Sequence, residues 1–424
     1  MRPAWCRPRR RRRHRGSRNG GAHNRAAPGS SARRAPGKHP RVGWATRSYL
    51  VHVRQYARRL RSKLHAEIAS LPEHSAWHTP RMPLNAVQVA DAFGLGSVLE
   101  DRPLANGDRP AVTRVVSTTN GRWVVKHDRL GSAGRLDLST WQRGKAWTVH
   151  RLESAAAAAG IPMAQPVQPP EPSVGFWYAP PDSDGELARV TEWVEGRDLR
   201  EARVPDEELA TWLGGVLARI AQLDVAVDED ADASSVFPLD EWRGWVREAE
   251  SKADPALARA AHAVLGVVED SADLVAEALR NRPALTMTHG DAAPANILAT
   301  PSGLVLIDWE SATADVAWWD AASNAVRLAA PDERSIAGGD PRIIRALIGS
   351  YRDAGGPAGP ADATAFGGLL IGHLSFTAWC LWVALGHRDE SAEQVAFCTR
   401  SLFDSAEHLP RILRELDDWA RLLA

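Results

Sequence analysis

Two short polar motifs in the second half of the sequence could carry out one kind of chemistry. Residues 288–291 have the sequence Thr-His-Gly-Asp, and residues 307–310 have the sequence Ile-Asp-Trp-Glu. Asp291 could accept the proton of a hydroxyl group. The amide oxygen of Asn296 and the carboxylate of Asp308 could bind Mg²⁺ together with the phosphates of a nucleotide. Phosphoryl transfer needs positioning, charge neutralisation and a proton acceptor, so this pattern predicts a phosphoryl-transfer centre.

The intervals between these residues indicate how the backbone could bring them together. Five positions separate Asp291 from Asn296, which is typical of a tight loop that turns two polar side chains toward one site. Twelve positions separate Asn296 from Asp308, and the intervening residues predict a β-hairpin with a turn at 300–303. We therefore expect the three side chains to lie close together.

The elements upstream of these motifs predict a small antiparallel sheet with one helix. A first helix is expected between Asn85, a plausible N-cap, and Gly94, a plausible stop. The Asn-Gly pairs at 106–107 and 120–121 are strong hairpin signals. The expected strands are Ser97–Leu104, Ala111–Thr118, Arg122–His127, Phe176–Tyr178 and Ala188–Val194, and a helix is expected over Leu136–Ala159, ended by Gly160 and Pro162.

Beyond Gly196 the sequence predicts a mostly helical domain. The candidate helices are Leu209–Leu223, Asp240–Lys252, Pro255–Asn281, Arg342–Asp353, Ala363–Leu385 and Ala392–Leu423. The expected organisation is a basic extension over 1–81, a nucleotide-binding domain over 82–195 and a helical domain over 196–424 that carries the catalytic loop and the acceptor site.

The net charge of zero hides a strong asymmetry along the chain. Residues 1–81 have a net charge of +19, residues 82–200 of −1 and residues 201–424 of −18. The basic segment lacks apolar periodicity up to about residue 45, a composition that cannot bury enough apolar surface to fold. A basic helix is expected over Thr46–Ser70.

Three interpretations of residues 1–81 remain open. The segment could bind nucleic acid or an acidic membrane through its charge. It could be an organelle-targeting peptide, because it is rich in Arg and poor in acids. We favour a third hypothesis, in which translation starts at or near Met82, where the composition changes abruptly. Intact-mass measurement would test it.

The cysteine and apolar patterns bear on the compartment. Cys6, Cys380 and Cys398 are far apart in sequence, which argues against a disulfide framework and favours a reducing, cytoplasmic environment. No apolar run of about 18 residues was identified, so we expect no membrane span. The sequence does not indicate the oligomeric state.

The motifs around Asp291 and Asp308 resemble those of the aminoglycoside phosphotransferase and choline kinase family. This resemblance implies a bilobal, protein-kinase-like α+β fold, with a small antiparallel N-lobe sheet and a mostly helical C-lobe. It implies that Asp291 is the catalytic base, and that Asn296 and Asp308 hold Mg²⁺. It also implies supporting roles for His289 in the loop and for Asp320, which is expected to bond the catalytic loop.

The same resemblance implies a nucleotide site for ATP or GTP. Residues 123–126 (Trp-Val-Val-Lys) resemble the strand whose lysine binds the α- and β-phosphates, so Lys126 is the candidate. Glu153, the only acid between Asp137 and Gly160, is the expected helix partner of Lys126. The backbone groups of Glu192 and Val194 are expected to bind the adenine. The first hairpin lacks a Gly-x-Gly-x-x-Gly motif, which weakens the assignment of a phosphate-binding loop.

We therefore predict a cytoplasmic Mg-ATP-dependent kinase that transfers a phosphate to the hydroxyl of a small molecule, such as an aminoglycoside, an amino alcohol or a sugar. The acidic C-terminal segment favours a cationic acceptor. Two alternatives are a nucleotide-binding regulatory protein without catalysis, and a basic-tailed module that associates with nucleic acid or membrane. The three polar catalytic positions argue against the first, and the sequence does not favour nucleic acid as a partner.

Overall fold

This computed structural model describes most of the chain after residue 83. The described residues are 84–104, 113–129, 139–180, 186–202, 204, 206–227, 236–331, 336–388 and 390–424, and all of them belong to one compact unit, His52–Ala424. Residues 1–81, with the helix expected over Thr46–Ser70, lie outside this part of the chain, as does the Asn-Gly pair at 106–107.

The first described helix, α2 (Ala86–Phe93), begins and ends where the sequence predicts. The side chain of Asn85 accepts a hydrogen bond from the backbone N–H of Gln88, and the Gln88 side chain accepts one from the N–H of Asn85. This reciprocal pair satisfies two backbone donors that a helix start leaves unpaired. Gly94 ends the helix in the left-handed region, with φ at 66°.

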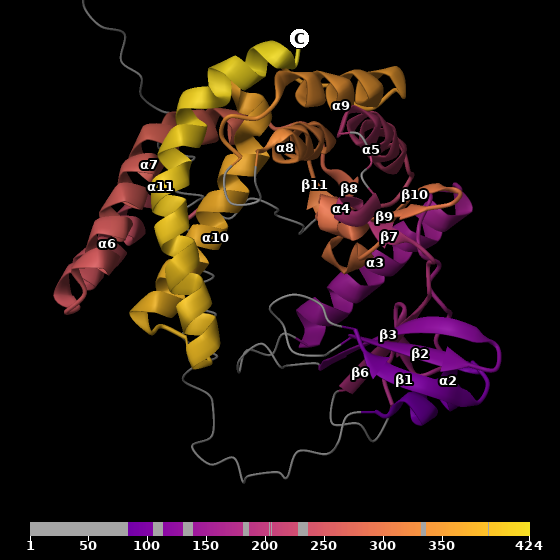
Figure 1. The fold of residues 1–424 in the computed structure, drawn as a ribbon. Coiled ribbons are helices and arrows are strands. Elements are labelled where there is room, and N and C mark those ends of the chain that lie inside the picture. The colour runs from indigo at the N-terminus through magenta and orange to yellow at the C-terminus, as the bar shows by residue number, and fades with distance from the viewer. Residues whose placement is uncertain are drawn as a thin grey trace, which may run out of the picture. The chain divides into compact units, whose positions relative to one another are not determined.

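A six-stranded antiparallel sheet forms the N-lobe (Figure 1). Its spatial order is β1-β2-β3-β6-β5-β4. The strands are β1 (Val98–Pro103), β2 (Thr113–Thr118), β3 (Gly121–Arg129), β4 (Ser173–Val174), β5 (Trp177–Tyr178) and β6 (Glu186–Glu192). In the register of the central pair, Lys126 on β3 lies opposite Arg189 on β6. Side chains of directly opposed residues point to the same face, so two cations are placed together.

The helix α3 (Ser139–Ala158) follows the first three strands and ends at Gly160, whose φ is 67°. It buries Val149, Leu152 and Glu153. Its neighbours include β4 and the turn η2 (Trp309–Ser311), which belongs to the second polar motif. A helix of the N-lobe is therefore in contact with the segment that carries Asp308.

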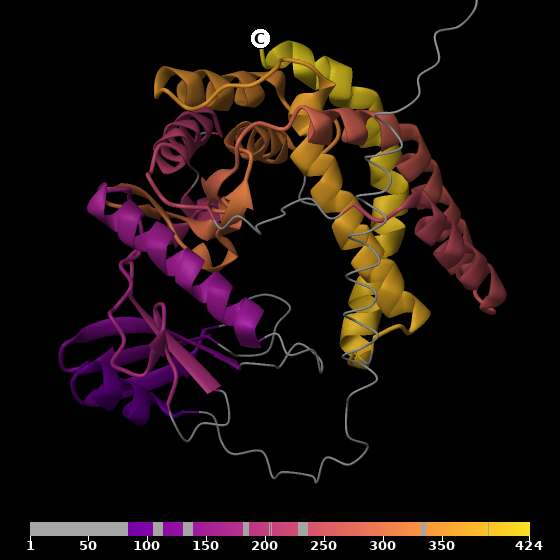
Figure 2. The same cartoon turned by 180° about the vertical axis from the view of Figure 1, so that it is seen from behind.

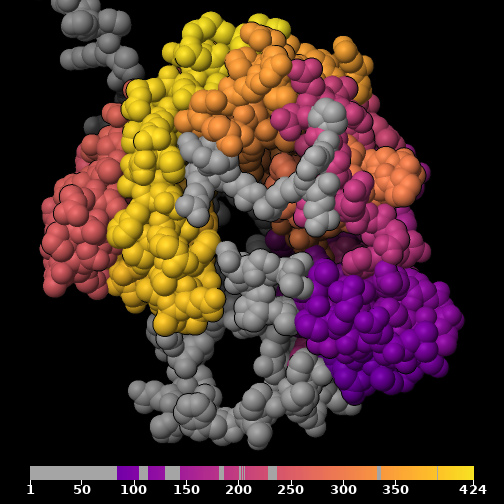
Figure 3. All heavy atoms as spheres, viewed as in Figure 1, coloured from indigo at the N-terminus to yellow at the C-terminus, as the bar shows by residue number. Residues whose placement is uncertain are grey.

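The C-lobe is mostly helical, as the sequence predicts (Figures 1 and 2). Its helices are α4 (Leu199–Ala202), α5 (Asp206–Ala221), α6 (Leu239–Ser251), α7 (Pro255–Arg280), α8 (Ala317–Ala329), α9 (Pro341–Asp353), α10 (Gly367–Leu385) and α11 (Ala392–Leu422). The helix α8 was not predicted from the sequence. In Figure 3 the side chains of α10 and α11 form a continuous yellow surface.

Short strands hold the polar motifs against this helical lobe. The hairpin expected after Asn296 is present as β9 (Ile297–Thr300) and β10 (Gly303–Leu306), and β7 (Arg197–Asp198) pairs with β9. A second ladder joins β8 (Thr286–Thr288) to β11 (Thr313–Asp315). Since β8 leads into the first motif and β11 leaves the second, this ladder fixes the two motifs side by side. Two further turns are η1 (Pro294–Asn296) and η3 (Ala363–Phe366).

One helix bears on the expectation that the chain has no membrane span. The stretch Ala363–Leu385, which contains α10, is long and apolar enough to cross a membrane by length and composition alone. This length and composition are weak evidence, because a helix in the core of a soluble protein passes the same test. Its apolar window is 56% buried, and α10 packs against α7, α8 and α11. These contacts are those of a helix in the C-lobe core.

Candidate active site

His289 anchors the loop that carries Asp291. Its ring is fully buried and packs edge-on against Trp309, with 4.8 Å between the ring centroids. Nε2 lies 3.1 Å from the carbonyl oxygen of Ile307, and Nδ1 accepts a bond of 3.3 Å from the backbone N–H of Asp291. Burial lowers the pKa of His289 to about 4, so the ring is neutral and can act as donor and acceptor at once. It therefore ties the first motif to the second.

Gly290 allows the two motifs to approach closely. Its φ is 75°, a conformation that favours glycine. A Cβ atom at this position would lie 2.3 Å from the carbonyl oxygen of Ser311. The backbone on both sides of the site is thus packed more tightly than any other residue would permit.

Asp291 and Asn296 are hydrogen-bonded to each other, and their spacing predicts that the two side chains lie close together. The Nδ2 atom of Asn296 donates to Oδ2 of Asp291 and to its backbone oxygen, both at 2.9 Å. These bonds fix the orientation of the carboxylate and leave the amide oxygen of Asn296 as the acceptor on that side chain. Both side chains are half-buried, so a ligand can reach them.

Asp308 adopts a strained backbone conformation and is in contact with Lys126. With φ at 66° and ψ at 59°, it is the non-glycine residue with positive φ in the described part of the chain. Such outliers persist where the surrounding structure enforces them, often at functional sites. Its Oδ1 lies 2.7 Å from Nζ of Lys126. The lysine of β3 and the carboxylate of the second motif, far apart in sequence, therefore meet.

Glu310 and Arg189 complete this cluster of charges. The Nζ atom of Lys126 also donates to Glu310, at 3.1 Å. Arg189 Nε lies 3.4 Å from the same carboxylate, and its Nη2 bonds Glu153. The predicted partnership of Glu153 with Lys126 thus needs correction, because the hydrogen bond of Glu153 goes to Arg189. The register of β3 and β6 causes this, since it places a second cation beside the lysine.

The pKa values within the cluster reflect burial and opposing charge. Burial lowers the pKa of Lys126, but Glu310 and Asp308 outweigh it, and the net pKa lies above the ordinary value. Burial and the neighbouring Glu310 raise the pKa of Asp308. Burial alone would raise the pKa of Glu310. The charges of Arg189 and Lys126 and a hydrogen bond with Asp308 outweigh this and hold the pKa of Glu310 well below the ordinary range. Glu310 is therefore the more acidic of these two neighbouring carboxyl groups.

The residues present fit a magnesium ion held jointly with a nucleotide. In the part of the chain that the structure describes, no group of three or more His, Cys, Asp or Glu side chains could hold a metal by itself. Mg²⁺ at phosphoryl-transfer sites needs only one or two protein oxygens, with phosphates and water as the other ligands. Asn296 offers an amide oxygen, and the carboxylate of Asp308 already accepts one cation, the ammonium of Lys126.

Some of the backbone groups at the end of β6, where adenine is expected to bind, already make hydrogen bonds within the protein. The backbone N–H of Glu192 donates to the carbonyl oxygen of Gln165 at 2.9 Å, and that of Trp193 donates to Arg122 at 3.0 Å. The N–H of Glu192 is therefore not available for adenine, which corrects that half of the expectation. Its carbonyl oxygen and the backbone of Val194 remain the predicted contacts.

Asp320 does not make the contact expected of it. Its Oδ1 accepts from Asn324 Nδ2 at 3.0 Å within α8, and a bond to the catalytic loop is not among its contacts with the described residues. Burial, and then the charge of Asp315, raise the pKa of Asp320 to about 7. Asp320 thus belongs to a second carboxylate pair, on β11 and α8.

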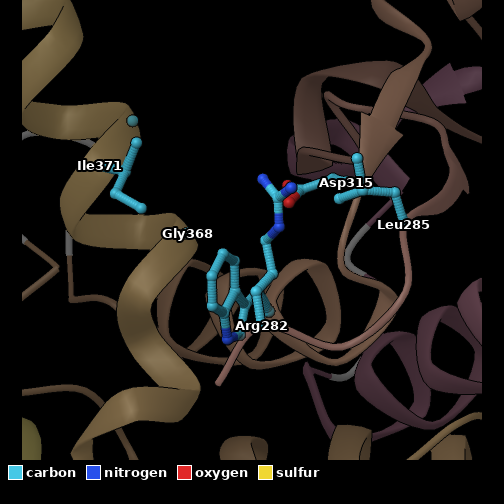
Figure 4. Close-up of a pocket in the computed structure, with 7 residues that line it drawn as sticks. Arg282, Leu285, Asp315, Gly368 and Ile371 are labelled. Carbon is cyan, nitrogen blue, oxygen red and sulfur yellow. The ribbon is translucent and has the colours of Figure 1, made fainter. Parts of the chain in front are cut away.

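A cavity of about 110 Å³ lies beside this second pair (Figure 4). Its lining comes from the segment between α7 and β8, from β11, from α8 and from α10: Arg282, Leu285, Asp315, Trp319, Gly368, Ile371 and Gly372. Figure 4 shows the guanidinium of Arg282 directed at the carboxylate of Asp315. The cavity therefore has one apolar wall on α10 and one charged wall on β11.

The architecture is that of a bilobal, protein-kinase-like phosphotransferase. The chain is similar in structure to a spectinomycin phosphotransferase in complex with ADP and spectinomycin, with a TM-score of 0.50, 12% identity and coverage of 78% of this chain and 100% of that one. It is also similar to an aminoglycoside phosphotransferase from Alicyclobacillus acidocaldarius (TM-score 0.49, 18% identity, 80% and 98% coverage). A third similar structure is choline kinase LicA from Streptococcus pneumoniae (0.42, 16%, 75% and 97%). At 12% identity, the likeness to the spectinomycin phosphotransferase concerns the fold alone.

A family model places the chain more specifically. The model described as "Phosphotransferase enzyme family" matches residues 101–357, more than half of the 424 residues. The chain therefore belongs to the phosphotransferase enzyme family, and it is an enzyme of the kinase type. A comparison with curated proteins finds no match.

Proposed function

We propose that this protein transfers the γ-phosphate of Mg-ATP to a hydroxyl group of a small molecule. The observation that carries the proposal is the contact of Lys126 with Asp308, because it joins the expected phosphate-binding cation to the expected metal carboxylate. Asp291 and Asn296 are held beside them by the ladder of β8 and β11 and by His289. These four polar side chains come from three segments of the chain, and their proximity supports the roles that phosphoryl transfer requires.

Each side chain has a distinct role in this proposal. Asp291, oriented by Asn296, accepts the proton of the acceptor hydroxyl and directs its oxygen toward the phosphorus. Asn296 and Asp308 hold Mg²⁺, which neutralises charge on the phosphates when it is bound. Lys126 binds the α- and β-phosphates after exchanging Asp308 for them. The carbonyl oxygen of Glu192 and the backbone of Val194 bind the base of the nucleotide, which is ATP or GTP.

The acceptor is proposed to be a small molecule that carries a hydroxyl and a positive charge. The C-terminal segment 201–424 has a net charge of −18, which raises the local concentration of cations. The cavity beside Asp315 is large enough for a group of a few heavy atoms, since an engineered cavity of about 150 Å³ holds benzene. An amino group there would face the ring of Trp319 and would replace the guanidinium of Arg282 at the carboxylate of Asp315.

The cellular setting is proposed to be the cytoplasm. Cys380 and Cys398 are both buried free thiols, which agrees with a reducing environment. We also retain the division into a nucleotide-binding domain over 82–195 and an acceptor domain over 196–424.

A phosphotransfer screen tests the proposed function. The protein is incubated with Mg-ATP or Mg-GTP and a panel of aminoglycosides, amino alcohols, sugars and other hydroxylated metabolites, and phosphate transfer is measured by mass spectrometry. Asp291→Asn is the control, because it keeps the shape of the side chain and removes the proton acceptor. Transfer by the wild type that Asp291→Asn lowers by orders of magnitude supports the proposal. Nucleotide binding without transfer to any acceptor in a broad panel would favour a regulatory protein instead.

A further inference from the structure

Arg189 lies between two carboxylates from different lobes, that of Glu153, which is buried, and that of Glu310, which is half-buried. Its Nη2 bonds Oε1 of Glu153 on α3, and its Nε lies 3.4 Å from Oε1 of Glu310 in η2. The side chains of Arg189 and Glu153 are 3% and 0% exposed, and that of Glu310 is 23% exposed. An arginine of the central strand β6 therefore connects the N-lobe helix to the segment that carries Asp308.

In this arrangement, different cations pair with the helix carboxylate Glu153 and with the carboxylate of Asp308. Lys126, directly opposite Arg189 in the sheet, makes its ion pairs with Asp308 and Glu310. Glu153 has its hydrogen bond to Arg189. The helix carboxylate is thus satisfied by the arginine, and the lysine is directed entirely toward the second motif. Glu310 is the group on which the two cations meet.

The buried polar atoms indicate that stability alone does not explain this cluster. Arg189 Nε and Nη1 and Glu153 Oε2 are buried without a hydrogen-bond partner in the described part of the chain. A buried ion pair with unsatisfied atoms is often no more stable than apolar residues of the same size. Unsatisfied buried groups tend to occur where function requires a particular arrangement of charges.

We propose that Arg189 is a positioning residue for the phosphate end of the nucleotide site. By neutralising Glu153 and holding Glu310, it keeps Lys126 directed at Asp308 and at the phosphates. Arg189 itself acts through Glu310 and Lys126. The inference rests on the proposed nucleotide-dependent function. It predicts that loss of Arg189 weakens binding of the phosphates and leaves binding of the nucleoside unchanged.

The test compares a phosphorylated with an unphosphorylated ligand. Arg189→Met alone would leave Glu153 buried and unpaired, which is strongly destabilising, so the pair is replaced together as Arg189→Met/Glu153→Leu. The probes are Mg–AMP-PNP and adenosine, measured by calorimetry on the full chain. The Kd of Mg–AMP-PNP is expected to rise by about tenfold or more, the effect of losing one charge-assisted contact in a buried site. The Kd of adenosine is expected to stay within about twofold of the wild-type value, because adenosine carries no phosphate. A twofold change corresponds to well under 1 kcal/mol.

A matched control comes from an ion pair of the C-lobe. Arg243 Nη2 and Glu269 Oε1 lie 2.8 Å apart on α6 and α7, and Arg243→Met/Glu269→Leu should bind both ligands as the wild type does. If the double variant at 189 and 153 does not fold, Arg189→Lys replaces it. This lysine keeps one charge but cannot span both carboxylates, so it should show the same selective loss for Mg–AMP-PNP to a smaller degree.

Two results would overturn the inference while leaving the proposed function intact. One is a wild-type Kd for Mg–AMP-PNP in these variants. The other is an equal loss of affinity for Mg–AMP-PNP and adenosine, which would show that the pair only holds α3 against the sheet. A wild-type protein that binds no nucleotide would overturn the proposed function, and the inference with it.

Discussion

Lys126 Nζ and Asp308 Oδ1 lie 2.7 Å apart, although 182 positions separate the two residues in the sequence. The lysine comes from the central strand of the N-lobe sheet, and the aspartate follows the hairpin of the C-lobe. This contact brings a cation to the carboxylate that is expected to hold Mg²⁺. A bound Mg-nucleotide would break this ion pair, because the metal would bind the carboxylate of Asp308 and the phosphates would bind the ammonium of Lys126.

The first prediction follows from this exchange. Lys126→Met should raise the Kd of Mg–AMP-PNP by roughly 10- to 100-fold, since a hydrogen bond to a charged group contributes about 1.5–3 kcal/mol. The Kd of adenosine should not change. Lys252→Met, at the end of α6, provides a control in the C-lobe. Wild-type affinity of Lys126→Met for Mg–AMP-PNP, measured by calorimetry, would show that Lys126 does not bind phosphate.

The second prediction uses the positive φ of Asp308. Asparagine tolerates this backbone region, whereas a β-branched residue does not. Asp308→Asn should therefore keep the Tm of the wild type within a few degrees, yet the Mg²⁺ concentration for half-maximal activity should rise by about tenfold or more, since one charged ligand is lost. Asp308→Val should also lower the free energy of unfolding, by about 1–3 kcal/mol. Unchanged Mg²⁺ dependence in Asp308→Asn would exclude this carboxylate as a metal ligand.

The third prediction concerns the close backbone approach at Gly290. Gly290→Ala would place a methyl group 2.3 Å from the Ser311 carbonyl oxygen and would strain a φ of 75°. The loop must move to relieve this, so Asp291 should be displaced and kcat should fall about 100-fold, as for a misplacement of about 1 Å. Gly349→Ala, in α9 with open space around it, should keep wild-type kcat and gain about 0.5–1 kcal/mol in stability. Equal kcat values for the two variants would contradict the argument.

The sequence was sufficient for those parts of the site that depend on local spacing. The five-residue interval predicts a tight loop that turns Asp291 and Asn296 toward one site, and the twelve-residue interval predicts the hairpin before Asp308, because both are decided within a single loop or turn. The cap at Asn85 is also a local matter. These parts of the fold could be predicted because few other local conformations satisfy the hydrogen-bonding groups of the backbone.

The remaining site residues depend on tertiary contacts that the sequence does not display. Arg189 looks like an ordinary strand residue until the register of β3 and β6 places it opposite Lys126. The role of Glu153 changes for the same reason, since two cations compete for one carboxylate. The helix α8 was not predicted from the sequence, and it packs against α5, α9 and η3.

The fourth prediction concerns stability as a function of pH. Burial raises the pKa of Asp315 to about 6 and that of Asp320 to about 7, from an ordinary value of 3.8. Between pH 3.8 and about pH 7 these two groups bind more protons in the folded state than in the unfolded state. The free energy of unfolding therefore falls as pH rises through this range, and it levels off above about pH 7.

The matched variants for this effect are Asp315→Asn and Asp320→Asn. Each should flatten the fall in the free energy of unfolding between pH 4 and pH 7, measured by urea denaturation and compared with the wild type at each pH. Because the difference between variant and wild type is used, titration of groups that do not interact with Asp315 or Asp320 cancels. A difference that is constant with pH would mean that neither carboxylate has a raised pKa.

The last prediction tests the cavity as part of the acceptor site. Gly372 lines this cavity on α10, and no heavy atom lies within 4 Å of where its Cβ would be. Gly372→Leu should therefore fill the cavity without disturbing the helix, and the better helix former should add roughly 0.5–1 kcal/mol of stability. The KM for the acceptor should rise while the Kd of Mg–AMP-PNP stays at its wild-type value. Gly349→Leu, on the exposed face of α9, is the control. If Gly372→Leu leaves the KM of the acceptor unchanged, the acceptor binds elsewhere in the C-lobe.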